Sequence, residues 1–122
     1  MKRVLFIDDD YATQKIIGII FGSQDIVVDE CYAPTAAPIL IEKNGYDAIF
    51  VDYKLPIMNG VDLIKKMQSK IHCPVYVVSS MENDFIEDKV KSAGVNVNGI
   101  ISKNGFRKNL EAVINLLYGR RS

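Results

Sequence analysis

Four short apolar runs, each followed by polar residues, constrain the fold of this chain more than any other feature. The runs are residues 4–7, 48–51, 75–78 and 99–101. Continuous, largely β-branched runs of this length are typical of strands that are buried on both faces of a parallel sheet. In such sheets, ligands bind beyond the carboxyl ends of the strands. The polar residues that follow the runs are therefore expected to face a single cleft.

These polar residues suit one another chemically. They are three consecutive aspartates, a fourth aspartate, a serine and a lysine: Asp8, Asp9, Asp10, Asp52, Ser79 and Lys103. Taken singly, they could be a solvated acidic turn, a serine that caps a turn and a surface lysine. Together, adjacent carboxylates that repel one another call for a cation, and their oxygens suit Mg²⁺. A hydroxyl and an ammonium could hold the oxygens of a phosphoryl group.

Segments with helical spacing separate the apolar runs. They are residues 13–21, 34–43, 61–67, 83–93 and 106–118, and Asn83 is predicted to cap the fourth of them. Residues 26–31 also have the composition of a strand, but they include two acidic residues and are more polar than the other runs, as expected of a strand at a sheet edge. Five alternations of strand and helix predict an α/β fold with a doubly wound parallel sheet and helices on both faces.

Length and charge point to one domain without a nucleic-acid or membrane surface. The chain has 122 residues, and its 15 Lys and Arg balance its 15 Asp and Glu. We expect a domain over residues 1–119 and a tail or linker stub over residues 120–122. The first apolar run is too short for a signal peptide or a membrane span. Cys31 and Cys73 have no metal-binding spacing, which fits free thiols in a reducing cytoplasm.

Over residues 2–118, the chain resembles the receiver domain of bacterial two-component response regulators, the CheY-like family. The resemblance rests on the Asp8-Asp9 pair and on Ser79 and Lys103. It rests most specifically on the segment VDYKLPIMNG, in which Asp52 is followed by proline and glycine at the family's offsets. It implies a flavodoxin-like sheet of five strands in the order 2-1-3-4-5.

The resemblance also implies a chemistry for the cleft. Asp52 would take a phosphoryl group from the phosphohistidine of a histidine kinase, or from a small donor, and form an acyl phosphate. Mg²⁺ would be held by Asp8, Asp9, Asp52 and the backbone carbonyl of Lys54. The cation would offset the charge that develops on the transferred group.

Lys103 and Ser79 would bind oxygens of the phosphoryl group, and the movement of Ser79 would alter the surface that partners contact. The implied protein is a signalling switch, not an enzyme with external turnover. Its upstream partner would be a sensor histidine kinase or a phosphotransfer protein, and its downstream target an unidentified protein. We expect no binding of nucleic acid or membrane by this domain.

The chain departs from the family pattern near its last strand. Ile100 stands three residues before Lys103, where many receivers have an aromatic switch residue. Asn104 replaces the usual proline after the lysine, and we expect a trans Lys103–Asn104 peptide because a non-proline cis bond costs about 3 kcal/mol. Lys54 and Met81, two residues after Asp52 and Ser79, are expected to slow loss of the phosphoryl group.

Two other functions remain open from sequence. A haloacid-dehalogenase-type phosphatase also uses an aspartate nucleophile with magnesium, and the chain offers Asp8 and Asp10 in a D-x-D arrangement. Ala12, however, stands where that family has Thr or Val. A receiver-like module that binds partners independently of phosphorylation is the second alternative. Ile100 and Asn104 keep it open, whereas the intact set of site residues argues against it: Asp8, Asp9, Asp52, Ser79 and Lys103.

Overall fold

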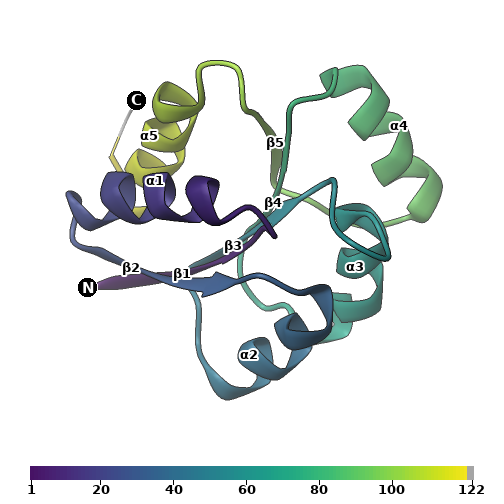
Figure 1. Cartoon of the computed structure of the whole chain (residues 1–122), viewed down its shortest axis with the longest axis horizontal. Coiled ribbons are helices and arrows are strands. Elements are labelled where there is room, and N and C mark those ends of the chain that lie inside the picture. Colours follow the sequence, from purple (N-terminus) through teal and green to yellow (C-terminus); the bar gives the residue numbers. More distant parts are fainter. Residues whose placement is uncertain (121–122) are drawn as a thin grey trace.

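The computed structural model describes residues 1–120, which fold around one parallel sheet (Figure 1). The strands are β1 (Lys2–Ile7), β2 (Ile26–Cys31), β3 (Ala48–Asp52), β4 (Val75–Ser79) and β5 (Gly99–Ser102). Their order is β2-β1-β3-β4-β5, and every neighbouring pair is parallel. The predicted fold class and strand order are confirmed, and the polar strand β2 lies at an edge.

Helices cover both faces of the sheet. They are α1 (Tyr11–Gly22), α2 (Ala37–Lys43), α3 (Gly60–Met67), α4 (Asn83–Ala93) and α5 (Phe106–Leu117). Figure 1 shows α1 and α5 on one face and α2, α3 and α4 on the other. Short 3₁₀ turns at Pro34–Ala36 and Gln68–Lys70 precede α2 and follow α3. No helix in this part of the chain is both long and apolar enough to span a bilayer.

Alternate residues of the central strands supply the two halves of the core. Val4 and Phe6 face α1 and α5, whereas Leu5 and Ile7 face the other three helices, and all four are fully buried. This alternation follows from the two-residue period of a strand. Burial on both faces explains why the central strands are continuous apolar runs in the sequence.

Helix starts differ in detail from the predicted ones. The first helix begins at Tyr11, two residues earlier than predicted, because Asp10 caps it and accepts a hydrogen bond from the Ala12 amide. Asn83 is the first residue of α4 and not its cap. The cap position belongs to Glu82, whose side chain makes no capping hydrogen bond.

The loop after β5 is built as predicted. Residues 1–120 contain no cis peptide bond, so the Lys103–Asn104 bond is trans. Asn104 donates its amide to Ser102 Oγ at 3.1 Å, and Gly105 completes the turn with φ of 68°. Of the expected tail, only residue 120 belongs to the described part of the chain; residues 121 and 122 lie outside it.

Candidate functional site

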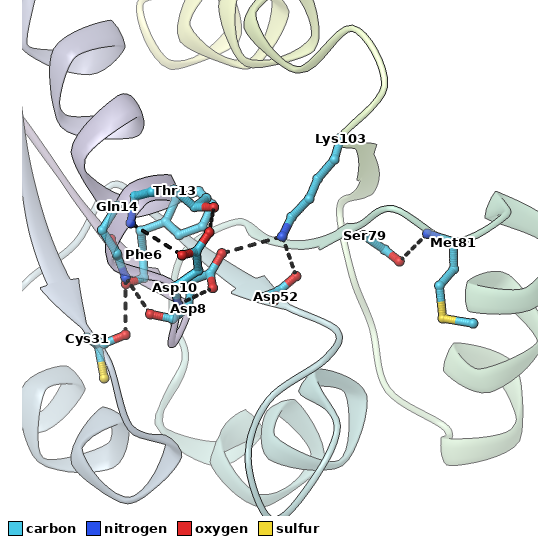
Figure 2. Close-up of polar contacts among 11 residues, drawn as sticks. Phe6, Asp8, Asp10, Thr13, Gln14, Cys31, Asp52, Ser79, Met81 and Lys103 are labelled. Carbon is cyan, nitrogen blue, oxygen red and sulfur yellow. Dashed lines mark hydrogen bonds and ion pairs between the residues drawn. The ribbon is translucent and has the colours of Figure 1, made fainter.

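Three of the predicted site residues meet at the carboxyl edge of the sheet. The Lys103 Nζ atom lies 3.2 Å from Oδ1 of Asp52 and 3.6 Å from Oδ2 of Asp8. These residues follow or end β5, β3 and β1, and Figure 2 shows the lysine reaching across to both carboxylates. Asp8, Asp52 and Lys103 thus lie together as expected from the strand ends, because the carboxyl ends of parallel strands share one edge.

An acidic cluster at this edge can hold a divalent cation. Carboxylate oxygens of Asp8, Asp9 and Asp52 all lie within 4.8 Å of one another. Asp8 and Asp52 are buried and Asp9 is exposed, so the cluster opens to solvent on one side. Oδ1 of Asp8 accepts the Asp10 amide at 2.9 Å, whereas its buried Oδ2 has no hydrogen-bond partner. This oxygen has the Lys103 ammonium 3.6 Å away but accepts no hydrogen bond, and together with two further carboxylates it suits a hard cation such as Mg²⁺.

Burial and mutual repulsion disturb the ionisation of this cluster. Burial, reinforced by the charge of Asp8, raises the pKa of Asp52 to about 6. Burial likewise raises the pKa of Asp8. For Lys103, burial opposes the charge, but the two carboxylates outweigh it and hold the pKa above its usual value. The site is therefore short of positive charge even with the lysine in place.

Ser79 is buried at the end of β4, but its hydroxyl faces away from the carboxylates. The Ser79 Oγ accepts the Met81 amide at 2.9 Å, and Figure 2 shows it directed towards Met81. The backbone of Ser79 is nevertheless hydrogen-bonded to a site residue, because the Lys103 amide donates to the Ser79 carbonyl at 2.9 Å. Because Oγ is the acceptor towards Met81, the O–H of Ser79 is free to donate, but the side chain would have to turn away from the Met81 amide to reach a ligand at Asp52.

The loop from β3 to α3 is held tightly against Asp52. The Gly60 amide donates to the Tyr53 carbonyl at 2.8 Å, and a Cβ on Gly60 would lie 2.3 Å from the Asp52 carbonyl oxygen. Only glycine fits such a close approach. Lys54 lies on this loop with its side chain exposed, and its backbone pairs with Asn59.

An aromatic contact connects Tyr53, the residue after Asp52, to helix α4. The rings of Tyr53 and Phe85 meet edge to face, with centroids 5.9 Å apart. The ammonium of Lys89 lies over the Phe85 ring, 5.2 Å from its centroid. Ile100, which stands at the position of the missing aromatic, is half-buried against the core on the α2–α4 face.

Sequence reasoning missed Gln14, a buried residue of α1 beside the acidic turn. Its side-chain amide donates to the carbonyls of Phe6, Asp8 and Cys31 (Figure 2). The other buried residues of this helix are apolar: Ile17, Ile20 and Phe21. A polar residue on the apolar face of a helix is the signal that could have identified it.

Comparison with known proteins agrees with this geometry. A family model described as "Response regulator receiver domain" matches residues 4–115. The cell cycle response regulator CtrA of Brucella ovis is 29% identical over 119 residues, a match that covers 97% of this chain and 50% of CtrA. The chain thus spans about half the length of the CtrA relatives it matches.

Solved structures give the same result. The Francisella response regulator 1452 receiver domain is 26% identical, with a TM-score of 0.83 and 98% of each chain covered. The Thermotoga maritima response regulator TrrA, solved in complex with Mg²⁺ and BeF, is 16% identical with a TM-score of 0.82, covering 96% of this chain and 99% of TrrA. This last likeness concerns the fold alone.

Proposed function

This chain belongs to the response regulator receiver domain family, and we propose that Asp52 is the residue at which it accepts a phosphoryl group. Members of this family generally act as switches that accept a phosphoryl group from a histidine kinase and then act on downstream targets. The observation that carries the assignment to Asp52 is its contact with Lys103, which lies within reach of both Asp52 and Asp8. Asp52 is a buried carboxylate that belongs to the acidic cluster and lies 3.2 Å from the Lys103 ammonium.

The three carboxylates fit Mg²⁺, and the backbone carbonyl of Lys54 would complete the protein's share of the ligands. Bound there, the cation would offset negative charge on the transferred group, which is where catalysis of phosphoryl transfer chiefly lies. It would also favour the ionised form of Asp52, whose pKa burial raises to about 6. An ionised carboxylate is the nucleophile that the transfer needs.

In the proposed reaction, a carboxylate oxygen of Asp52 attacks the phosphorus atom of a phosphohistidine. A phosphorus–oxygen bond to Asp52 forms, the phosphorus–nitrogen bond breaks, and the imidazole leaves with the bonding electron pair. Lys103, already 3.2 Å from Asp52 Oδ1, is placed to hold an oxygen of the incoming group. A small donor such as acetyl phosphate would react in the same way, with acetate leaving.

Ser79 would transmit the effect of phosphorylation from Asp52 to helix α4. The Ser79 hydroxyl would donate to a phosphoryl oxygen at Asp52, and turning it from its present direction towards Asp52 would draw Oγ away from the Met81 amide that it now accepts. The segment after Ser79 leads into α4, whose Phe85 packs on Tyr53. We propose that this contact, and not the Ile100 position, links the site to the partner surface.

The upstream partner we propose is a sensor histidine kinase or a phosphotransfer protein, and the downstream target is an unidentified protein. We place this exchange in the cytoplasm, where the free thiols of Cys31 and Cys73 would remain reduced. Residues 1–119 are proposed as the receiver unit. The proposal includes no turnover of external substrates.

The test is the intact mass of the protein after incubation with acetyl phosphate and Mg²⁺. We expect one added phosphoryl group that requires Mg²⁺ and is absent from Asp52→Asn, with Asp88→Asn on exposed α4 as the matched control. An equal adduct on Asp52→Asn would contradict the assignment. No adduct from either acetyl phosphate or phosphorylated kinases would favour a phosphorylation-independent binding module. Turnover of a generic phosphate ester would favour the phosphatase alternative.

A further inference from the structure

Gln14 has no role in the function proposed so far, although it is fully buried beside the acidic turn. It is the one polar residue among the four buried positions of α1. Its Nε2 atom lies 2.9 Å from the Phe6 carbonyl oxygen, 3.1 Å from that of Asp8 and 3.2 Å from that of Cys31. One side chain therefore holds the carboxyl ends of β1 and β2 and the first residue of the turn that follows β1.

This amide reinforces a backbone contact at the same place. The Asp8 amide donates to the Cys31 carbonyl at 2.9 Å, and Gln14 donates to that same carbonyl. Asp8 is thereby fixed through both its amide and its carbonyl, while its Oδ1 accepts the Asp10 amide. The orientation of the Asp8 carboxylate thus depends on a network to which two side chains from outside the turn contribute: Gln14, through the backbone, and Lys103, whose Nζ lies 3.6 Å from Oδ2.

The glutamine is an unfavourable choice if packing alone is considered. Its Oε1 atom is buried without a hydrogen-bond partner, which is destabilising. A methionine of similar length would fill the space without an unpaired oxygen. The presence of an amide is explained by what its NH₂ group does, because no apolar side chain can donate to these carbonyls.

We infer that Gln14 is a positioning residue of the metal site, which holds the turn carrying Asp8 and Asp9 in the arrangement that binds Mg²⁺. This inference rests on the proposed function. Mg²⁺ tolerates little departure from octahedral geometry, so its affinity depends on how rigidly the protein oxygens are held. Loss of residues that orient metal ligands typically weakens metal binding 10- to 100-fold.

The test compares Gln14→Met with Gln68→Met, the same change at an exposed position of the 3₁₀ turn after α3. Mg²⁺ affinity is measured by titration calorimetry, and the free energy of unfolding without Mg²⁺ by urea denaturation. We expect the dissociation constant to rise about tenfold or more for Gln14→Met and to stay within twofold of wild type for Gln68→Met. A purely structural glutamine would change the unfolding free energy and leave the Mg²⁺ affinity of the folded protein unaltered.

A measurement on the wild-type protein covers the case in which Gln14→Met fails to fold. The chain has three glutamines, Gln14, Gln24 and Gln68, so glutamine-selective ¹⁵N labelling gives three side-chain amide signals. Those of Gln24 and Gln68 are assigned by their loss in Gln24→Glu and Gln68→Glu. We expect Mg²⁺ to shift the Gln14 signal while the other two stay in place. An unmoved Gln14 signal at saturating Mg²⁺ would overturn the inference.

Failure of the inference and failure of the proposed function give different results. If the wild-type protein binds Mg²⁺ and Asp52→Asn weakens that binding, the proposed site stands. Unchanged affinity in folded Gln14→Met would then refute the role of Gln14 alone. If the wild-type protein binds no Mg²⁺, the proposed metal site itself is refuted, and the positioning role with it.

Discussion

The ammonium of Lys103 lies 3.2 Å from Oδ1 of Asp52 and 3.6 Å from the buried Oδ2 of Asp8, so one lysine serves two carboxylates. Those carboxylates are two of the three that we propose as Mg²⁺ ligands. The lysine and the cation thus share the same negative charge. They would oppose each other in binding to the free site and act together once a phosphoryl group adds further negative charge.

Lys103→Met should therefore change Mg²⁺ affinity and phosphorylation in opposite directions. Removing a positive charge next to Asp52 is expected to tighten Mg²⁺ binding by about tenfold. The rate of phosphorylation by acetyl phosphate should fall by about tenfold or more, because a phosphoryl oxygen loses its cation. Calorimetry and intact mass against time measure the two effects. Lys66→Met, on the exposed surface of α3, is the control, and weaker Mg²⁺ binding by Lys103→Met would contradict this account.

Asp52→Asn should stabilise the protein in Mg²⁺-free buffer above pH 6. The pKa of Asp52 is raised from 3.8 to about 6, so the folded state binds its proton more tightly than the unfolded state does. The wild-type protein then loses stability as the pH rises between these values, up to about 3 kcal/mol at roughly 1.4 kcal/mol for each pKa unit. The neutral amide escapes this loss.

Urea denaturation at pH 5 and pH 8 measures that difference. We expect the advantage of Asp52→Asn over wild type to be larger at pH 8 than at pH 5. Asp88→Asn, at an exposed position of α4, should show no such dependence. If the stability advantage of Asp52→Asn over wild type became smaller as the pH rose, ionisation of the Asp52 carboxyl would not destabilise the folded protein, and the prediction would be wrong. Saturating Mg²⁺ should reduce the effect, because it binds the ionised carboxylate.

Two glycines distinguish close approach from helix propensity. Gly60→Ala places a Cβ 2.3 Å from the Asp52 carbonyl oxygen, so the β3–α3 loop must move; we expect a loss of about 2–3 kcal/mol and impaired phosphorylation. Gly18→Ala in α1 meets no atom within 4 Å and should stabilise by about 0.5–1 kcal/mol. Urea denaturation of both variants checks this. If both variants changed the free energy of unfolding equally, the β3–α3 loop would accommodate the added Cβ without loss of stability, and the prediction would be wrong.

Ile57 is a strained residue on the same loop. It is β-branched, has φ of 77° and is 87% exposed, so its side chain gains little from packing while its backbone is unfavourable. Ile57→Gly should stabilise by about 1 kcal/mol. Ile16→Gly, at an exposed position of α1, should destabilise by about the same amount. The opposite signs are measured by thermal or urea unfolding, and destabilisation of both would argue that Ile57 makes contacts worth more than its strain.

Lys54 and Met81 are expected to shield the acyl phosphate from water. Both side chains are long, and they stand two residues after Asp52 and Ser79. Lys54→Ala combined with Met81→Ala should shorten the phosphoryl half-life several-fold, measured by the decay of the intact-mass adduct after donor removal. Lys65→Ala, on exposed α3, serves as control. An unchanged half-life in the double variant would refute the shielding role.

The strand ends could be located from sequence because a buried parallel strand leaves a local pattern. An apolar run such as residues 48–51 is typical of such a strand, and the residue after it, Asp52, is then expected at the edge where ligands bind. The order of the strands came from resemblance to a family, since apolar runs do not state which strand pairs with which. Helix starts were predicted less accurately: Asn83, the predicted cap, is the first residue of α4, whereas Asp10 caps α1 two residues before the predicted start of that helix.

The sequence by itself determined the alternation of strands and helices and the chemical types that meet at the carboxyl edge of the sheet, because the alternation follows from periodicity along the chain and the chemical types from the residues at the strand ends. Only the tertiary structure decided how those groups are shared: that Lys103 contacts Asp8 and Asp52, that the Ser79 hydroxyl is bound to the Met81 amide, and that Gln14 reaches three carbonyls. Such contacts join residues up to 95 positions apart, as between Asp8 and Lys103. They depend on side-chain directions and burial, which local sequence does not specify.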